Sequence, residues 1–452
     1  MDKTYNHKNT EERIYYFLEK KGYFKPEINP KGKPYSIILP PPNANAPLHF
    51  GHAMYVIEDI LVRYHRMKGD ETLWLPGADH AGFETQFVFE QKLKKEGKSR
   101  FNYDRETLYR MIWDYVQENR PIMENQLRKL GFSLDWTRAK FTLDKDIIAI
   151  VYKTFKKLYD DGLIYREKRL INYCTFDGTS FSDLEVVHKE EETTLYFIKY
   201  GKITVATTRP ETMLADVAVA VNPKDKRYKD LVGKKVILPI VNKKIQIIAD
   251  LQVDMDFGTG VVKVTPGHDP KDFEIAKRHN LKGESVIGFD GKIKVGKYKG
   301  LFPKQAREKI VGDLKSKKLI EKEEKITHTI PTCYKCKHTI EPLLMDQWFI
   351  KMEPLATPAI NAVKKEKIKI YPKRFEKVLL DFLENIRDWN ISRQIVWGIR
   401  IPAWQCQNCR KWIVAEGETS RACSYCSSSN LKKDQDTFDT WFSSAQWTFV
   451  EI

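Results

Sequence analysis

Residues 35–77 alternate between short apolar runs and a helical pattern, and this order constrains the fold more than any other feature of the chain. The run YSIIL at 35–39 is typical of a buried strand, and TLWLPG at 72–77 indicates a second one. Between them, apolar side chains recur at helical spacing from Gly51 to Gly69, where the glycine suits a helix end. This order predicts a βαβ unit of an α/β, doubly wound parallel sheet, which binds ligands at the carboxyl ends of its strands.

Two histidines, His49 and His52, stand where the loop after the first strand becomes the helix. A helix N-terminus offers free backbone N–H groups and the positive end of the helix dipole, so this position attracts phosphate. The spacing would let both imidazoles face a nucleotide and donate hydrogen bonds to it. The hexapeptide PLHFGH alone leaves a second interpretation open, in which the two side chains are solvated or serve packing.

The chain of 452 residues carries 77 lysines and arginines against 61 acidic residues, a formal net charge of +16. This excess favours a polyanionic partner, with nucleic acid ahead of a membrane surface. The N-terminus lacks the apolar core of a signal peptide, and no stretch has the apolar length that a bilayer requires. We therefore expect a cytoplasmic protein of two to four domains with no membrane partner.

A change of character along the chain predicts an inserted domain. Short β-type runs separated by Gly, Asp, Asn and Pro turns fill residues 192–328, whereas the flanking chain alternates between helices and strands. We expect a helical extension at 1–34 and the two halves of an α/β domain at 35–165 and 346–452. The connecting segments, with a candidate zinc module, are expected at 166–191 and 329–345.

Three C-x2-C pairs account for six of the seven cysteines, and in a reducing compartment they indicate metal or redox chemistry rather than disulfides. Cys406, Cys409, Cys423 and Cys426 have the spacing C-x2-C-x13-C-x2-C. This spacing closes a tetrahedral zinc ribbon of four thiolates, expected at 404–428, with a redox or unligated role as the alternative.

Longer strings carry a resemblance to a known family. The chain resembles the class I aminoacyl-tRNA synthetases, and within them the valyl enzymes, in PPPNANAPLHFGHAMYVIEDILVRYHRMKGDETLWLPGADHAGFETQ. Here HFGH is similar to the class signature His-x-Gly-His. PGADHAG resembles the valyl enzymes, since isoleucyl and leucyl relatives carry different strings at that place. The resemblance returns, in order, at TTRPETMLADVAVAVNP, DFGTGVVKVTPGHDPKDFEIAKRH, DWNISRQIVWGIRIPAW and DTFDTWFSSAQW. It implies a Rossmann-like catalytic domain that joins L-valine to tRNA(Val) through a valyl-adenylate, using ATP with Mg²⁺.

The resemblance also implies a catalytic site. His49 and His52 would stabilise the phosphates while the valine carboxylate attacks the α-phosphorus. Asp79 would hold the ammonium group of the amino acid. The other implied ATP contacts are Pro42, Asn43, Gly51 and Asp439, and the other implied amino-acid contacts are Pro41, Trp397 and Trp441.

A pocket shaped for valine cannot strongly reject threonine, which has nearly the same shape. The resemblance therefore implies that residues 192–328 form an editing domain that hydrolyses mischarged threonyl-tRNA. Asp272 would pair with the substrate ammonium, and Asp269 and Thr265 would suit the threonine hydroxyl. The other implied editing residues are Thr207, Thr208, Phe257, and Arg209 and Lys263, of which the last two suit the tRNA end.

The third cysteine pair, Cys333 and Cys336, lacks a C-x2-C partner. In zinc-bearing relatives the partner follows the string NWC, and NYCTFDG here offers Cys174 and then Asp177 in place of a cysteine. Since a carboxylate oxygen can ligate zinc, the resemblance implies a candidate Cys3Asp site for a second structural Zn²⁺, whose occupancy stays open.

Several positions depart from the family pattern. Asn45 and Ala46 stand where Thr and Gly are usual, Glu84 replaces a small residue, and Ile399 replaces a histidine. The Ala46 change tests whether alanine can take a conformation that glycine adopts freely. A KMSKS-like loop is also missing, from which we expect a fragment of a monomeric synthetase that activates valine poorly. An isoleucyl-type synthetase and a non-activating RNA-binding or editing protein are the alternatives.

Overall fold

The computed structural model describes residues 5–417, 420 and 422–450. The chain forms two compact units, of which the first contains Met1–Ile164 with Ser392–Ile452 and the second contains Tyr165–Ile391. The second unit therefore interrupts the first in sequence. Among the described residues, no helix combines the length and the apolar character that crossing a membrane demands.

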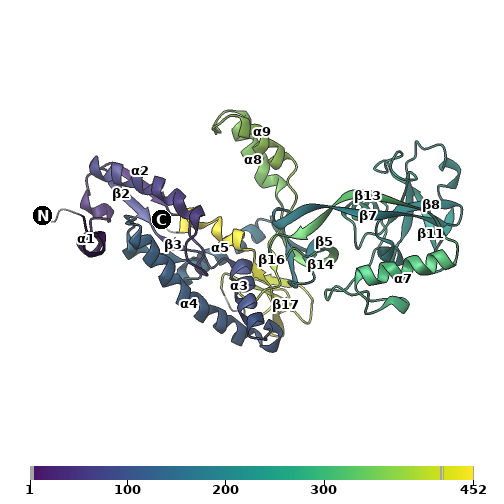
Figure 1. Ribbon diagram of the computed structural model, residues 1–452, viewed down its shortest axis with the longest axis horizontal. Coiled ribbons are helices and arrows are strands. Elements are labelled where there is room, and N and C mark those ends of the chain that lie inside the picture. The colour runs from purple at the N-terminus through teal and green to yellow at the C-terminus, as the bar shows by residue number, and fades with distance from the viewer. Residues whose placement is uncertain (1–4, 418–419, 421, 451–452) are drawn as a thin grey trace. The chain divides into compact units, whose positions relative to one another are not determined.

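The first unit contains the predicted strand, helix and strand. β1 (Pro34–Ile38) and β2 (Glu71–Leu75) pair in parallel, with Pro34 opposite Glu71 and Ile38 opposite Leu75. The 3-10 turn η2 (Phe50–Met54) and helix α2 (Tyr55–Met67) connect them (Figure 1). The βαβ unit predicted for 35–77 is confirmed, while the larger doubly wound sheet stays a prediction.

Helix α2 buries a different face from the one its apolar pattern suggests. Its buried side chains are Tyr55 and Val62. On the same side, Glu58 accepts a hydrogen bond from Trp74 Nε1 at 3.2 Å, so hydrogen-bonded polar groups share the inner face. The five apolar residues that mark the helix in the sequence are 43–65% exposed; these are Val56, Ile57, Ile60, Leu61 and Tyr64.

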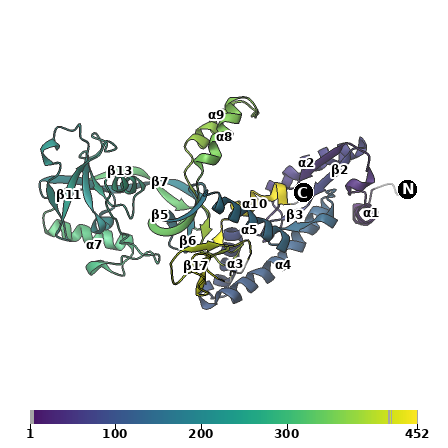
Figure 2. The ribbon, with the colours of Figure 1, turned by 180° about the vertical axis from the view of Figure 1, so that it is seen from behind.

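The rest of the first unit is mainly helical up to residue 160, and Figure 2 shows α3, α4 and α5 from behind. Its other helices are α1 (His7–Lys20), α3 (Gly82–Lys95), α4 (Arg105–Lys129), α5 (Lys145–Asp160), α10 (Thr440–Ser444) and α11 (Trp447–Val450). β3 (Gly77–Ala78) pairs in parallel with β4 (Lys140–Phe141), and β16 (Ser392–Arg393) pairs antiparallel with β20 (Thr437–Phe438). β17 (Ala403–Cys406), β18 (Trp412–Val414) and β19 (Leu431–Lys433) make a small antiparallel sheet.

The second unit is built from three sheets. One has the order β15 (Trp389–Asn390), β14 (Glu341–Ile350), β5 (Ile164–Cys174) and β6 (Thr179–Phe181). Another has the order β13 (Ile320–Cys333), β7 (Val186–Tyr200) and β8 (Ile203–Thr207). The third has the order β10 (Lys235–Leu238), β11 (Lys243–Ala249), β9 (Ala218–Val221) and β12 (Val261–Val264). The helices are α6 (Pro270–Arg278), α7 (Pro303–Ser316), α8 (Glu353–Lys364) and α9 (Arg374–Glu384).

Burial along the strands of the second unit accounts for the β-type pattern of residues 192–328. Buried and exposed residues alternate along β10, where Val236 and Leu238 are buried and Lys235 and Ile237 are exposed. The β-type runs predicted within 192–328 include the segments 194–200, 203–208, 234–241 and 244–250, which overlap β7, β8, β10 and β11.

Residues 346–391 group with the second unit rather than with 392–452, because β14 pairs with both β5 and β15. The functional domain boundaries proposed from the sequence stay predictions.

Candidate functional sites

The two histidines form a closed cap at the start of η2. His49 Nδ1 accepts a hydrogen bond from the backbone N–H of Gly51 at 3.1 Å, and His52 Nδ1 accepts one from the backbone N–H of His49 at 3.0 Å. The ring centroids lie 4.1 Å apart. The structure therefore brings His49, Gly51 and His52 together at the helix entry, where the sequence places a phosphate site.

These contacts constrain where the imidazole protons lie. His49 Nδ1 accepts from the Gly51 N–H, so the proton of a neutral His49 ring is on Nε2. His52 Nδ1 lies 3.0 Å from both the N–H and the carbonyl oxygen of His49, so either tautomer of His52 finds a partner there. Burial lowers the pKa of His52, with the neighbouring His49 adding to the effect and the backbone at His49 opposing it, so the neutral ring is favoured. The pair can thus offer imidazole N–H donors at the helix entry.

The predicted ATP loop and the predicted ammonium anchor are joined through the backbone. Asp79 N donates to Pro42 O, and Ala44 N donates to Asp79 O, both at 2.9 Å. Asn43 stands opposite Asp79 in this short parallel bridge and is exposed, whereas Pro41 is half-buried. The carboxyl end of β1 therefore lies beside the residue expected to bind the amino acid.

The Asp79 side chain is buried and held in the charged form. Burial alone would raise its pKa, but hydrogen bonds and charge from His80, with further donors, bring the pKa below its ordinary value. Oδ1 accepts from the Ala81 N–H and the Thr142 hydroxyl, each at 3.1 Å. Oδ2 accepts from the Ser444 hydroxyl at 3.1 Å. This is a fixed carboxylate suited to an ammonium group.

Trp397 is fully buried beside this anchor. Its Nε1 donates to His80 O at 2.7 Å, and its backbone N–H donates to Gln86 Oε1 at 3.1 Å. Its ring packs against Tyr109 and Trp113, at centroid distances of 5.3 and 6.2 Å. These contacts fix the orientation of the indole ring beside His80, two residues before α3 begins.

Asp439 caps α10, where its Oδ1 accepts from the Trp441 N–H at 3.0 Å. Its Oδ2 accepts from Arg393 at 2.5 Å, and both side chains are buried. Trp441 itself is 62% exposed. Sequence reasoning missed Arg393, since a buried ion-pair partner leaves no trace in apolar periodicity.

Two departures from the family pattern find a structural account. Ala46 keeps a backbone conformation open to any L-residue, so glycine is not required there. Asn45 Nδ2 donates to Thr85 Oγ1 at 3.0 Å in a buried contact that ties the loop to α3. Glu84 is half-buried and Ile399 is buried in the core.

The predicted editing residues come together around Lys263. Its Nζ donates to Thr212 Oγ1 at 2.9 Å and to Thr265 Oγ1 at 2.6 Å. Thr265 in turn donates to Asp216 Oδ1 at 2.6 Å, and Lys263 Nζ lies 3.7 Å from the same oxygen. Sequence reasoning missed Thr212 and Asp216, although both lie within the matched string TTRPETMLAD.

Asp272 and Asp269 lie at the start of α6. Asp269 caps the helix by accepting from the N–H groups of Lys271 and Asp272, at 2.8 and 3.1 Å. Asp272 is buried, and its Oδ2 accepts from the Thr265 N–H at 2.8 Å. Burial, and then the charge of Asp269, raise the pKa of Asp272 to about 7 against the opposing charge of Lys263. This carboxyl can gain or lose its proton near neutral pH.

Arg209 is engaged within the protein. Its guanidinium donates to Glu211 Oε1 at 3.0 Å and to Glu341 at 2.6 Å, while Arg307 donates to Glu211 Oε2 at 2.8 Å and to Oε1 at 2.9 Å. Such a paired cluster holds the turn after β8 in place. The neighbouring threonines are Thr207, which accepts from the Arg209 N–H at 3.1 Å, and the half-buried Thr208.

The remaining predicted editing residue, Phe257, is 60% exposed. It lies on the loop between β11 and β12, and no contact in this structure draws it toward Lys263 among the hydrogen bonds and ring contacts of the described residues. A buried histidine, His268, was also missed. Its Nε2 accepts from Val286 N at 2.7 Å, and burial lowers its pKa to about 3, so it is neutral and serves as a clamp.

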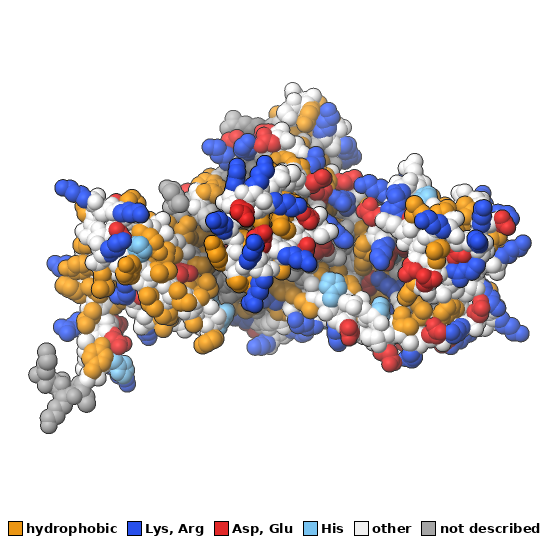
Figure 3. Space-filling view, turned by 90° about the horizontal axis from the view of Figure 1, so that it is seen from above, with side chains coloured by type: hydrophobic (Ala, Val, Ile, Leu, Met, Phe, Trp, Pro, Cys, Tyr) orange, Lys and Arg blue, Asp and Glu red, His pale blue; other side chains and the backbone are white. Residues whose placement is uncertain are grey.

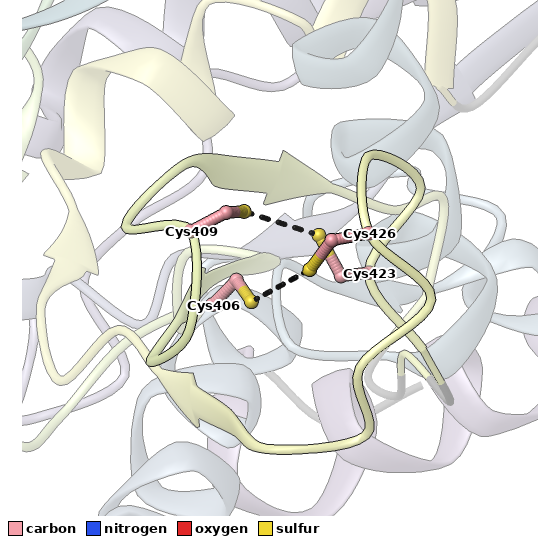
Figure 4. A group of neighbouring side chains, drawn as sticks. All are labelled: Cys406, Cys409, Cys423 and Cys426. Atoms are coloured by element: carbon pink, nitrogen blue, oxygen red, sulfur yellow. Dashed lines mark hydrogen bonds between the residues drawn. The ribbon is translucent and has the colours of Figure 1, made fainter.

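Four cysteines of the first unit converge as the spacing predicts. Cys406 Sγ lies 3.6 Å from Cys426 Sγ, and Cys409 Sγ lies 3.6 Å from Cys423 Sγ. Figure 4 shows Cys406 and Cys409 on one loop and Cys423 and Cys426 on the facing loop, with the four sulfurs pointing toward one another. All four are free thiols, and the ligand atoms lie within 4.8 Å of one another. This set can hold one metal ion.

The second set converges as well, at the ends of β5 and β13. Asp177 Oδ2 accepts from the thiols of Cys174 and Cys333, each at 3.1 Å, and Cys174 Sγ lies 3.5 Å from Cys336 Sγ. Burial raises the pKa of Asp177 to about 6. One carboxylate oxygen and three sulfurs, all within 4.8 Å of one another, are ligands that Zn²⁺ accepts, so these donors fit a metal.

Comparison with known families decides what kind of protein carries these sites. The model of the family described as tRNA synthetases class I (I, L, M and V) matches residues 13–452. The chain belongs to this family. The family resemblance predicted from the sequence is confirmed.

Several relatives of this chain are named valine–tRNA ligases. The chain is 50% identical over 460 residues to the valine–tRNA ligase of Petrotoga mobilis, covering 100% of this chain and 52% of that protein. It is 47% identical over 461 residues to the enzyme of Clostridium acetobutylicum, at the same coverage. For Thermotoga maritima the identity is 48% over 458 residues, covering 99% and 53%. The chain thus spans about half the length of the curated relatives it matches.

Proposed function

We propose that this chain forms the adenylation and editing parts of a valine–tRNA ligase. The observation that carries the proposal is the 50% identity to such a ligase over all of the chain. The substrates are L-valine, ATP as its Mg²⁺ complex, and tRNA(Val). The isoleucyl-type alternative is not favoured, because the relatives at 45–50% identity are named valine–tRNA ligases.

In the first half-reaction, a carboxylate oxygen of valine attacks the α-phosphorus of ATP, and pyrophosphate leaves. Asp79 holds the ammonium group, because its carboxylate is charged and fixed by three donors. Imidazole N–H groups of His49 and His52 donate to phosphate oxygens and favour the transition state, in which negative charge spreads over those oxygens. Bound Mg²⁺ supplies further charge neutralisation.

In the editing reaction, water adds to the ester carbonyl of threonyl-tRNA, and the ribose oxygen leaves with a proton. Ionised Asp272 pairs with the threonyl ammonium, which fixes the ester beside Thr265 and Lys263. Asp216 is a positioning residue, since it accepts the hydrogen bond from the Thr265 hydroxyl and thereby leaves one lone pair of the Thr265 oxygen, beside the one that accepts from Lys263, as an acceptor. An acceptor there suits the hydroxyl that threonine has and valine lacks.

The first test measures binding of non-hydrolysable aminoacyl-adenylate mimics by calorimetry. We expect one valyl mimic per chain, bound at least about 10-fold more tightly than the isoleucyl mimic, because a well-packed pocket loses affinity with each methylene it must accommodate. This readout does not require turnover. Equal or reversed affinities, or no binding of either mimic, would contradict the proposed substrate.

We further propose that both cysteine-containing sets bind structural Zn²⁺. Metal analysis after dialysis against a weak chelator should give two zinc ions per chain. Cys409→Ser and Cys336→Ser should each retain one, because a site with three ligands binds zinc more weakly.

The aspartate offers a matched gain-of-affinity control for the second site. Asp177→Cys should convert it to four thiolates and make its zinc harder to remove, while leaving the ribbon unchanged. One zinc in the unaltered chain that is lost in Cys409→Ser would show that the Cys3Asp set is empty. If the number of zinc ions per chain is the same in the parent and in all of these variants, both assignments are wrong.

A further inference from the structure

The second unit carries a helical hairpin formed by α8 and α9, which lie side by side and are joined by residues 365–373 (Figure 1). The inner contacts are few: Ala356 and Val363 are the buried residues of α8, and α9 has none. The end of the hairpin, residues 364–377, is called the tip here. None of the sites described above uses it.

The tip concentrates positive charge. Its 14 residues, KKEKIKIYPKRFEK, include seven lysines and arginines and two glutamates, a net +5 within a chain of net +16. All seven cationic side chains are exposed: Lys364, Lys365, Lys367, Lys369, Lys373, Arg374 and Lys377. Figure 3 looks onto the hairpin from above and shows blue side chains gathered over it.

Most of these cations have no acidic partner. Lys364 pairs with Glu384 at 2.6 Å, and within the described residues no other cation of the tip makes an ion pair. Because like charges at close spacing repel one another, an unpaired cluster is costly unless an anion binds it.

Exposed aromatic rings lie among the cations. Tyr371 is 83% exposed and Phe375 is 48% exposed, with the Arg374 guanidinium 5.2 Å from the Phe375 ring centroid. Lysines alone would suit any polyanion. Lysines alternating with accessible rings suit a nucleic acid strand, because the rings stack on bases while the cations meet phosphates.

A membrane surface is the competing polyanion, since Phe375, Val378 and Phe382 form an exposed apolar stripe on α9. The charge pattern argues against it. Beyond Lys377, the helix carries Asp381 and Glu384 and no cation. An interfacial helix carries cations along its polar face, and these two acids would be repelled by anionic lipid headgroups.

We propose that the tip of the α8–α9 hairpin is an RNA-binding site, in which the lysines contact phosphates and Tyr371 stacks on an unpaired base. It rests on the proposed function in one respect, namely that the RNA is tRNA. The site is separate in the chain from both the adenylation and the editing residues, so its loss leaves those side chains in place.

The test compares three variants of the full chain for binding tRNA(Val), by fluorescence anisotropy at several salt concentrations. The first is Lys367→Gln, Lys369→Gln and Lys373→Gln combined, and the second is Tyr371→Ala. The control is Lys224→Gln, Lys226→Gln and Lys229→Gln combined, which removes three exposed lysines of the same unit. Circular dichroism checks that each variant folds.

The triple tip variant should weaken binding at least about 10-fold and reduce the slope of log affinity against log salt by about 2, since roughly one counterion is released per phosphate contact. Tyr371→Ala should weaken binding about 10-fold with an unchanged slope, because stacking involves no counterion. The control triple should change affinity less than about 2-fold.

Wild-type affinity and slope in the triple tip variant, or an equal loss in the control, would overturn the proposal. Tip-dependent binding to phosphatidylserine vesicles without tip-dependent RNA binding would also overturn it. The valyl-adenylate mimic separates the two proposals. If the mimic binds and the tip substitutions do not change RNA binding, only this inference is wrong. If the tip substitutions weaken RNA binding and the mimic does not bind, the proposed enzyme function is wrong.

Discussion

Asp272→Asn should lower the rate of threonyl-tRNA deacylation by about 100-fold or more, because the substrate ammonium would lose the carboxylate proposed to pair with it in the editing site. The isosteric amide can still accept the hydrogen bond from the Thr265 N–H, so the fold should persist. Deacylation is measured under single-turnover conditions, with the exposed substitution Asp230→Asn as the control. Unchanged deacylation in Asp272→Asn would remove Asp272 from the proposed role.

The pH dependence of the same reaction provides an independent readout. The pKa of Asp272 is raised to about 7, so kcat/KM corrected for uncatalysed hydrolysis should rise as pH passes through neutrality. Asp272→Asn should lack this step. The raised pKa also means that the folded chain holds this proton more tightly than the unfolded chain, so the Asp272 contribution to stability falls as pH rises from about 4 to 7. The variant should therefore unfold at higher temperature than the parent at pH 8, which misfolding cannot mimic.

Asp79→Asn should weaken binding of the valyl-adenylate mimic by about 100-fold or more, since the substrate ammonium would face an amide instead of a buried carboxylate. The hydrogen bonds from Ala81 N–H and Thr142 can remain, because the amide oxygen still accepts them. Calorimetric titration of parent and variant measures the loss.

A mimic that lacks the amino group is the matched ligand control for Asp79. It should bind the parent and Asp79→Asn with similar affinity, because it has no charge for Asp79 to hold. If both mimics weaken equally, Asp79 supports the pocket rather than the ammonium group, and the assignment is wrong.

Apolar periodicity identified α2 but not its orientation. The spacing of Val56, Ile57 and Ile60 correctly indicates a helix, yet these residues are exposed. The inner face depends on Tyr55, Val62 and on hydrogen bonds such as that of Glu58 to Trp74. Periodicity finds where apolar side chains gather, whereas tertiary hydrogen bonds decide which side is covered.

The candidate sites show the same division. Fixed spacing predicted which cysteines converge, because four ligands in two tight turns leave few geometries. It could not predict that Arg209 is occupied by Glu211 and Glu341, since Glu341 lies 132 residues away in sequence. Nor could it reveal Asp216, whose importance comes only from the threonine and lysine brought to it by β12.

The Cys3Asp set lies at one end of the long antiparallel pair formed by β7 and β13, so metal binding there would stabilise that end. The pairing runs from Val186 opposite Cys333 to Ile198 opposite Ile320, and the third strand, β8, joins only from Tyr196 onward. A two-stranded stretch in water is marginally stable, and here it has the β8 pairing at its far end and Cys333, the proposed metal ligand, at its base. If the proposed ion is removed, fraying should begin at that base and travel outward while the three-stranded end stays intact.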